Sequence, residues 1–346
     1  MDSDCPPGYT TRGYAGPGDH AAMAVALSEF HLHDGDGEVV TTEQIDVTYS
    51  NIPLTDLEHD VIIVEHVTDG VVGYGRTGWD DTPEGRTQFW VAPLRTSHLA
   101  EPLLIALVSR LERRATERAA LEPAKHHVFR CWIPHAGPDQ PLGDTPAGWL
   151  HNIGYRAVRF GASMVRPHLN DILELPLPDG VDLRPVDTGQ LRAIWEADVA
   201  AFAGEFGSQE PTTEQWLDFR DNPIADPTLW KVAWSGDRIV GQVRSYINEQ
   251  ENESQHRLRG YTEFISTHAE WRGRGLASSL LAISLREVRD RGMAEAALGV
   301  DTENPANALG IYQRLGFALT GYEAVMDKPI PLPPVKPAGN GGPARS

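Results

Sequence analysis

The sequence feature that most constrains the fold is a glycine-rich corner that joins a predicted strand to a predicted helix. Residues 278–291 place apolar side chains at helical spacing, so they predict an amphipathic helix, and Gly273 and Gly275 stand just before it. The first N–H groups of such a helix have no partner within it, and the helix dipole is positive there. Because glycine lets a bulky anion approach the backbone, the corner predicts a phosphate site, to which Arg272 and Arg274 add charge-assisted contacts.

Several motifs follow one another around this corner. Residues 272–277 read Arg-Gly-Arg-Gly-Leu-Ala, asparagines stand at 304 and 307, and Tyr312 lies in an Ile-Tyr-Gln-Arg-Leu-Gly-Phe segment that ends at residue 317. In this order they resemble the acyl-CoA signature, the asparagine position and the Leu-Tyr-x-x-x-Gly-Phe ending of the GNAT superfamily of N-acetyltransferases. The resemblance implies a GNAT fold that uses acetyl-CoA as acyl donor, although the signature leaves a longer acyl donor open.

The resemblance also implies which residues hold acetyl-CoA. Backbone groups of the strand should pair with the pantetheine arm and polarise the thioester carbonyl, the corner should hold the pyrophosphate, and the two asparagines should contact pantetheine. The implied set is Ile265, Ser266, Thr267, Arg272, Gly273, Arg274, Gly275, Leu276, Ala277, Ser278, Asn304 and Asn307.

Acetyl transfer to an amine needs a base for the amine and an acid for the departing thiolate. Tyr312 is the candidate acid, since a phenol stays protonated at neutral pH; the alternative is a tyrosine that only packs beside the cofactor. Glu263 is the candidate base, directly or through water. It precedes Ile265 by two residues, so strand alternation predicts that both face the same side. Glu263 could instead bind a cationic substrate or be solvated, and His268 is the other candidate base.

The acceptor site is expected between the end of a helix near residue 202 and the loop 248–256. Phe202, Glu205, Phe206 and Glu249 are its candidate residues, and a solvated, charged loop is the alternative. The whole chain carries 49 acidic and 30 basic residues. This balance disfavours nucleic acid as a partner and favours a small cationic amine, such as an antibiotic, amino sugar, polyamine or amino-acid derivative.

The chain repeats itself. Thr-Thr-Glu-Gln occurs at 41–44 and at 212–215, and similar strand and helix patterns surround both. The repeat predicts two copies of one α/β (α+β) fold, and the resemblance implies that they are tandem GNAT folds, each a mixed, mainly antiparallel, twisted sheet flanked by helices. This layout is similar to that of the mycothiol synthases. The predicted boundaries are a disordered start at 1–8, a degenerate GNAT-like domain at 9–174, a linker at 175–180, a catalytic domain at 181–328 and a Pro/Gly-rich disordered tail at 329–346.

The two copies differ at the corner. Aligning Arg95 with Arg272 puts Thr96 and His98 where the second copy has its two glycines, and Leu150 replaces Tyr312. A side chain at the His98 position would fill the space of a pyrophosphate. The first copy is therefore predicted to be a structural partner without chemistry.

Composition adds limits. The two cysteines are too few for a disulfide framework, the first 18 residues lack a signal-peptide pattern, and no apolar run is long enough to span a membrane, so a cytoplasmic monomer or homodimer is expected. No metal is expected, because His31, His33, His126 and His127 lack a second ligand pair. Two rivals stay open: an acetyltransferase for protein N-termini or lysines, and a CoA-binding sensor or scaffold without turnover.

Overall fold

The computed structural model describes residues 5–33, 38–52, 56–82, 85–122, 125–208, 211–303 and 308–332. The first half contains β1 (Tyr9–Gly13), α1 (His20–His33), α2 (Thr42–Asn51), α3 (Leu57–Asp60), β2 (Val61–His66), β3 (Gly70–Thr82), β4 (Gly85–Val91), α4 (Glu101–Ala119), β5 (His127–His135), α5 (Pro146–Asn152) and β6 (Arg156–Arg166). The second contains β7 (Asp182–Arg184), α6 (Leu191–Phe202), α7 (Thr213–Asp221), β8 (Lys231–Ser235), β9 (Arg238–Tyr246), α8 (Glu249–Ser254), β10 (Arg259–Thr267), α9 (Leu276–Asp290), β11 (Glu295–Asp301), α10 (Ala308–Arg314) and β12 (Ala318–Pro329).

The element order of the first half, apart from α3, recurs in the second, apart from α8, so the prediction of two copies of one fold is confirmed. The repeated Thr-Thr-Glu-Gln segments even form the same local structure. Thr41 and Thr212 each cap the helix that follows, and each exchanges hydrogen bonds with the glutamine three residues on, Gln44 and Gln215 respectively. This reciprocal capping box satisfies two backbone donors at each helix start, so both copies begin their second helix by the same sequence signal.

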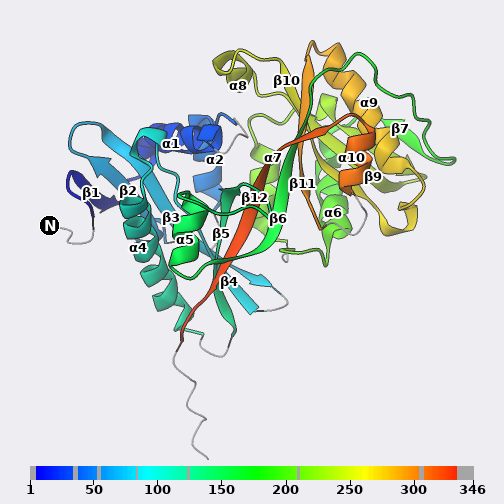
Figure 1. Ribbon diagram of the computed structural model, residues 1–346. Helices are drawn as coiled ribbons and strands as arrows, with labels where there is room; N and C mark the ends of the chain where they lie inside the picture. Colours follow the sequence, from blue (N-terminus) through cyan, green and yellow to red (C-terminus); the bar gives the residue numbers. More distant parts are fainter. Residues whose placement is uncertain are drawn as a thin grey trace, which may run out of the picture.

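The described strands form one twelve-stranded sheet in the order β1-β2-β3-β4-β5-β12-β6-β11-β10-β9-β8-β7. The two copies exchange their last strands within it. β12, from the second half, pairs with β5 and β6, while β6, from the first half, pairs with β11. In Figure 1 the red strand β12 and the green strand β6 run through the middle of the molecule, between the two halves. The halves are therefore joined by main-chain hydrogen bonds as well as by the linker.

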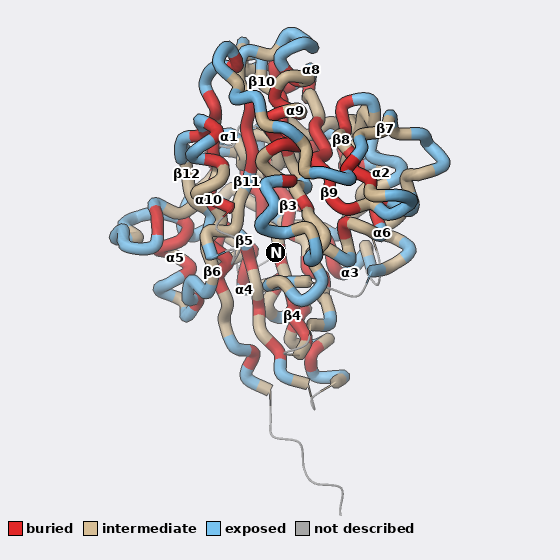
Figure 2. Tube along the Cα trace, turned by 90° about the vertical axis from the view of Figure 1, so that its right-hand side faces the viewer, coloured by how far each residue is buried: buried red, intermediate tan, exposed pale blue. Residues whose placement is uncertain are grey.

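Helices cover both faces of the sheet. In the first half, Val61 and Ile63 of β2 pack with α1 and α2, whereas Val64 packs with α4 and α5 on the opposite face. In the second half, Val232 of β8 packs with α6, whereas Ala233 packs with α9. Figure 2 shows buried residues along the strands and exposed residues along the outer loops. None of the helices in the described part of the chain is both long and apolar enough to cross a bilayer.

Three local features differ from the expected pattern. Residues 249–254, expected as loop, form the short helix α8. Residues 5–8, expected to be disordered, lead into β1, and the amide of Tyr9 donates to the carbonyl of Pro6 (3.1 Å). At the other end Pro329 closes β12 and Ile330 is buried in the core of the first half, so the chain stays packed beyond residue 328. Residues 333–346 of the expected tail lie outside the described residues.

Candidate functional site

The centre of the candidate site is a split between the two parallel strands of the second half. β10 and β11 pair only where residues 259–261 face 295–297. Beyond that point β11 continues beside β6, and β10 continues beside β9, so the two strands diverge. On the side of β11, the backbone groups of β10 that follow Tyr261 consequently face the split rather than a neighbouring strand. An extended ligand could pair with such a strand edge by main-chain hydrogen bonds.

A β-bulge interrupts β10 inside this split. The register with β9 shifts between Glu263 and Ser266, and Phe264 has a left-handed φ of 49°. The bulge adds one residue, so it reverses the alternation of the side chains after it. Ile265 packs against the clusters that contain α9, whereas Glu263 lines the opposite face with α6 and α7. The prediction that Glu263 and Ile265 share a face is therefore wrong, because the alternation rule holds only for a regular strand.

Glu263 bridges the split. Its Oε1 accepts a hydrogen bond from the amide of Gly299 on β11 (2.8 Å). Its side chain lies in the walls of two cavities, one of about 480 Å³ along β6, β11 and β12 and one of about 550 Å³ between β10 and helices α6 and α7. A carboxylate in this position can meet ligands from either cavity.

The predicted phosphate corner has an open backbone. Gly273 (φ 75°) and Gly275 (φ 82°) are both left-handed, and a Cβ added at either would meet no atom within 4 Å. Gly275 is the N-cap of α9 and provides no side-chain cap, so the first N–H groups of the helix have no side-chain partner from this position. The corner can thus receive an anion, and its residues fit the pyrophosphate end of a CoA molecule.

The two arginines of the corner differ in their contacts. The guanidinium of Arg272 donates to the carbonyl of Ala201 (2.9 Å) and lies 3.8 Å from a carboxylate oxygen of Glu205, so it ties the end of α6 to the corner. The guanidinium of Arg274 lies 4.8 Å above the ring of Trp271. Both side chains are exposed, and Arg274 in particular is placed to meet a phosphate from solvent.

Tyr312 lies on α10, on the same face of the sheet as α9. It is 7% exposed and its ring packs edge-on against Phe317, with ring centroids 6.2 Å apart. Burial, and secondly the charge of Glu263, raise the pKa of this phenol well above its usual value. Tyr312 therefore keeps its proton at neutral pH, and Glu263 is near enough for its charge to be felt.

Hydrogen bonds at the two corners correct the alignment of the copies. The amide of Arg95 donates to Val72 and the amide of His268 donates to Val240 (2.9 Å each), and each of these residues begins a 3-10 turn. Arg95 thus corresponds to His268 rather than to Arg272. Two residues, 99 and 100, then lead into α4, whereas four, 272–275, lead into α9. The first copy does not place His98 on a glycine position; it lacks the Gly-x-Gly segment altogether.

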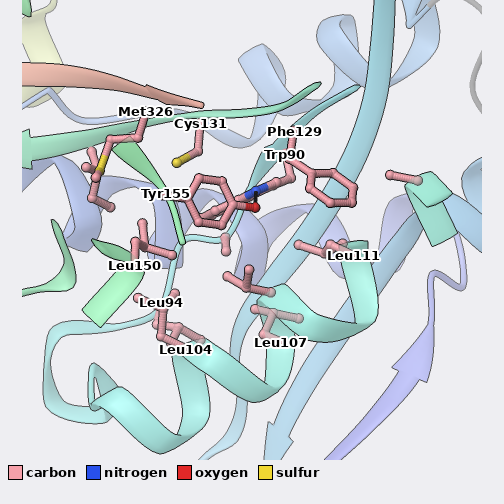
Figure 3. Packing of buried hydrophobic residues seen from close by; sticks show 14 of the residues in the cluster. Trp90, Leu94, Leu104, Leu107, Leu111, Phe129, Cys131, Leu150, Tyr155 and Met326 are labelled. Carbon is pink, nitrogen blue, oxygen red and sulfur yellow. Dashed lines mark hydrogen bonds between the residues drawn. The ribbon is translucent and has the colours of Figure 1, made fainter. Parts of the chain in front are cut away.

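Apolar side chains fill the matching split of the first copy. β4 and β5 pair in parallel only up to Phe89 and Arg130, and beyond that point Trp90, Cys131 and Ile133 are buried in one cluster. Figure 3 shows Tyr155 packed between Cys131 and Trp90, and the Trp90 indole donates to the Tyr155 hydroxyl (2.7 Å). Trp90, Cys131 and Tyr155 are 3%, 0% and 0% exposed. This split therefore has no room for a pantetheine arm.

The cavity of about 550 Å³ has walls from both halves of the chain. It is lined by Glu38, Gln44, Trp195, Asp198, Gln215, Asp218, Phe219, Asn222, Ile224, Ala225, Trp230, Arg244, Ser245, Tyr246, Glu263 and Phe264. Four of these residues are acids, and Arg244 is the single base among them. Burial raises the pKa of Asp198 and of Asp218. A cation that entered the cavity would therefore be favoured as a counter-charge.

Asp198 and Arg244 were not recognised in the sequence. An oxygen of Asp198 accepts a hydrogen bond from Nη2 of Arg244 (2.6 Å), and the guanidinium of Arg244 lies 3.9 Å above the ring of Phe264. The pair holds the bulged residue against α6. No local pattern marks these two residues, because they lie 46 positions apart and meet only through the pairing of α6 with β9.

The predicted acceptor residues do not all gather at Glu263. Phe206 lines the cavity of about 480 Å³, with the guanidinium groups of Arg130 and Arg159 within 5.0 Å of its ring centre. Glu205 instead faces Arg272, and Glu249 is exposed on α8 beside a different cavity. Phe202, at the end of α6, lines neither cavity that Glu263 shares. Asn304 and Asn307 lie outside the described residues.

Comparison with known proteins gives consistent results. The profile of a family described as "Acetyltransferase (GNAT) family" matches residues 191–317. A mycothiol acetyltransferase of Streptomyces bingchenggensis is 36% identical over 158 residues, which are 45% of this chain and 48% of the relative. One of Geodermatophilus obscurus is 27% identical over 261 residues, which are 74% of this chain and 78% of the relative. The chain thus spans about half the length of the first of these curated relatives.

Two solved structures share the whole architecture. A GCN5-related N-acetyltransferase from Sphaerobacter thermophilus superposes with a TM-score of 0.67 at 23% identity, covering 94% of this chain and 97% of that one. A tandem GNAT protein from the clavulanic acid biosynthesis pathway superposes with a TM-score of 0.65 at 12% identity, covering 94% and 100%. At these identities the likeness concerns the fold.

Proposed function

Because this chain belongs to the GNAT superfamily of N-acetyltransferases, with two GNAT folds in tandem, we propose that its second half moves an acetyl group from acetyl-CoA to a primary amine. One observation carries the proposal. The split between β10 and β11 leads from the open glycine corner at Gly275 to a carboxylate, Glu263, whose charge reaches a buried, protonated phenol, Tyr312. An anion site, a strand edge, an acid and a base then lie along one path.

Residues of the second half would hold the donor. The corner from Arg272 to Ser278 takes the pyrophosphate on the free N–H groups of α9, and the backbone at Ile265, Ser266 and Thr267 takes the amides of the pantetheine arm. Acetyl-CoA itself supplies an activated thioester. The bulge at Phe264 supports this assignment, because it turns backbone groups of β10 away from the regular ladder.

Tyr312 and Glu263 divide the proton transfers. Tyr312, kept protonated by burial, donates a proton to the departing thiolate. Glu263 accepts the proton of the amine, directly or through a water molecule, from the face of the sheet opposite to α9. The acetyl group passes directly between the two substrates in a ternary complex, without an enzyme nucleophile. The first half takes no chemical part, since its split is filled by Trp90 and Tyr155.

The acceptor is a small, cationic molecule that occupies the cavity of about 550 Å³. Its four acids outnumber its single base, Arg244, which pairs with Asp198, so the cavity favours a cation, and its aromatic walls favour a compact apolar portion. Glu38 and Gln44 of the first half form part of the wall of this cavity, whose other lining residues come from the second half. This additional wall supports a small molecule over a protein N-terminus or a lysine side chain, which would need an open groove.

The test is a thiol-release assay with acetyl-CoA over a panel of amines. The panel includes the acceptor of the mycothiol acetyltransferases, because the relatives described above carry that name. Replacing Tyr312 by phenylalanine is expected to lower kcat by about 10²- to 10⁴-fold, with the dissociation constant of CoA nearly unchanged. Unchanged turnover would remove Tyr312 from the mechanism. Tight CoA binding without thiol release for any amine would instead favour the alternative of a CoA-binding sensor or scaffold without turnover.

The setting of the reaction is part of the same proposal. Neither Cys5 nor Cys131 forms a disulfide in the part of the chain that the structure describes, and we place the reaction in the cytoplasm, where thiols stay reduced. The oligomeric state, monomer or homodimer, stays a prediction that sedimentation would settle. No metal takes part in the acetyl transfer as proposed.

A further inference from the structure

Two imidazoles and a carboxylate meet at the corner of the first half. His66 is the last residue of β2, Asp69 lies in the turn between β2 and β3, and His98 closes the 3-10 turn that precedes α4. Oδ2 of Asp69 lies 3.1 Å from Nδ1 of His66 and 3.1 Å from Nε2 of His98. All three potential ligand atoms lie within 4.8 Å of one another.

These separations suit one small metal ion. Zinc binds nitrogen and carboxylate oxygen at about 2.0–2.2 Å in a tetrahedron, so its ligand atoms stand roughly 3.3 Å apart. The two measured distances of 3.1 Å are close to that value. The two imidazole nitrogens lie within 4.8 Å of each other, so an ion could enter between the three side chains if the two rings moved closer together. Two histidines and one carboxylate are also a ligand set that zinc uses when a fourth position stays open to water.

Neighbouring groups hold the three side chains in place. The hydroxyl of Tyr9 lies 3.0 Å from Nδ1 of His98, the ring nitrogen that does not face Asp69. This contact fixes the orientation of the imidazole, as outer-shell partners of metal-bound histidines do. The hydroxyl of Thr68 donates to Oδ1 of Asp69 (2.9 Å) and lies 3.1 Å from Nδ1 of His66, so it contacts two of the three side chains.

The second half has a different group at the corresponding place. The amides of His98 and Trp271 make the same backbone hydrogen bond, to Arg95 and His268 respectively (2.8 Å each), so these two residues are equivalent. Trp271 offers no ligand atom and packs beneath Arg274. The first half therefore has a cation-type ligand set where the second has a corner for an anion. His98 lies in a different segment of the sequence from His66 and Asp69, so no local pattern predicted that the three side chains meet.

We propose that His66, Asp69 and His98 form a binding site for one divalent transition-metal ion, for which Zn²⁺ fits best. The ion would join the β2–β3 turn to the start of α4, two segments that the backbone hydrogen bond from Arg95 to Val72 already brings together. The site stabilises the first half and lies outside the acetyl-transfer site of the second. It does not depend on the proposed activity.

The test is a titration of chelator-treated full-length protein with ZnCl₂, followed by calorimetry, and with CoCl₂, followed by visible absorption. One ion per chain is expected, with the intense Co²⁺ absorption of a four-coordinate site and a zinc-dependent rise in melting temperature. Asp69→Asn and His98→Gln are each expected to weaken binding at least about tenfold. Asp237→Asn, in the equivalent turn of the second half, is the matched control and should bind like the wild type.

The side chain of Asp69 is 46% exposed, so Asp69→Asn should fold even if the variant that loses the buried His98 does not. Absence of stoichiometric binding would overturn the proposal. Binding that persists in Asp69→Asn, or that Asp237→Asn abolishes equally, would overturn it as well, because the ion would then sit elsewhere.

Discussion

Replacing Gly275 by alanine isolates the anion-binding role of the glycine corner. Gly275 is the N-cap of α9 and has a left-handed φ of 82°. Gly292, just beyond the other end of α9, has a φ of 89°, and a Cβ at either position would meet no atom within 4 Å. The two substitutions therefore impose the same backbone strain without a clash. Only the one at Gly275 places a methyl group at the predicted pyrophosphate site.

The magnitudes separate the two effects. A left-handed conformation costs alanine about 1–2 kcal/mol, so both variants should lose about this much free energy of unfolding. The new methyl group at Gly275 should also cost at least one charge-assisted hydrogen bond to phosphate, worth about 1.5–3 kcal/mol. That loss corresponds to a roughly 10- to 150-fold larger dissociation constant for CoA, and so to weaker binding. Gly292→Ala should leave CoA affinity unchanged.

Calorimetric titration with CoA and urea unfolding measure the two quantities on the same samples. Equal losses of stability together with a loss of CoA affinity only in Gly275→Ala would agree with the reasoning. Wild-type affinity in Gly275→Ala would refute it, because the helix N-terminus would then not hold the pyrophosphate. Equal weakening in Gly292→Ala would show that strain, not blocked access, is the cause.

Two further predictions concern the proton transfers and the exchanged strands. Glu263→Gln, which can still accept the amide of Gly299, should lower kcat by about 10²- to 10⁴-fold. It should also lower the pH at which activity falls on the alkaline side, which lies above about 10 in the wild type, because the charge of the Glu263 carboxylate helps to raise the pKa of Tyr312. A higher KM at unchanged kcat would instead identify Glu263 as a substrate contact. Met326→Ala should cost about 2–5 kcal/mol in urea unfolding, against about 0.5 kcal/mol or less for the exposed Leu319→Ala on the same strand. Similar losses in both variants would contradict the packing of β12 in the core of the first half.

Sequence reasoning succeeded where the signal is local. The Thr-Thr-Glu-Gln segments at 41–44 and 212–215 predicted two similar halves, and both segments form the same capping box at a helix start, which depends on four consecutive residues. The glycine corner can likewise be recognised from the sequence, because left-handed backbone at the start of an amphipathic helix favours glycine. Such features depend on neighbours in the chain and need no knowledge of the rest of the fold.

Reasoning from the sequence failed where the structure depends on distant partners. The bulge at Phe264 places a phenylalanine at a φ of 49°, which no propensity predicts, and the stacking of Arg244 on its ring comes from another strand. Matching Arg95 to Arg272 by residue type was natural. Yet the hydrogen bond to Val72 equates Arg95 with His268, because the first corner is two residues shorter. Residue identity was a poorer guide there than backbone pairing.

The first half contributes no catalytic residue to the proposed reaction, but the exchanged strands give it a structural role there. Gly299 of β11 pairs with Ser163 of β6, so the first half supports the strand whose amide holds Glu263. Without β6, β11 would be an unsupported edge beyond residue 297, and the width of the split would no longer be fixed. Because β12 is committed to β5 and β6, the second half cannot complete its own sheet alone. The first half, although its own split is filled by side chains, therefore remains necessary to the second half. Its strand β6 sets the geometry of the split in which the proposed chemistry takes place.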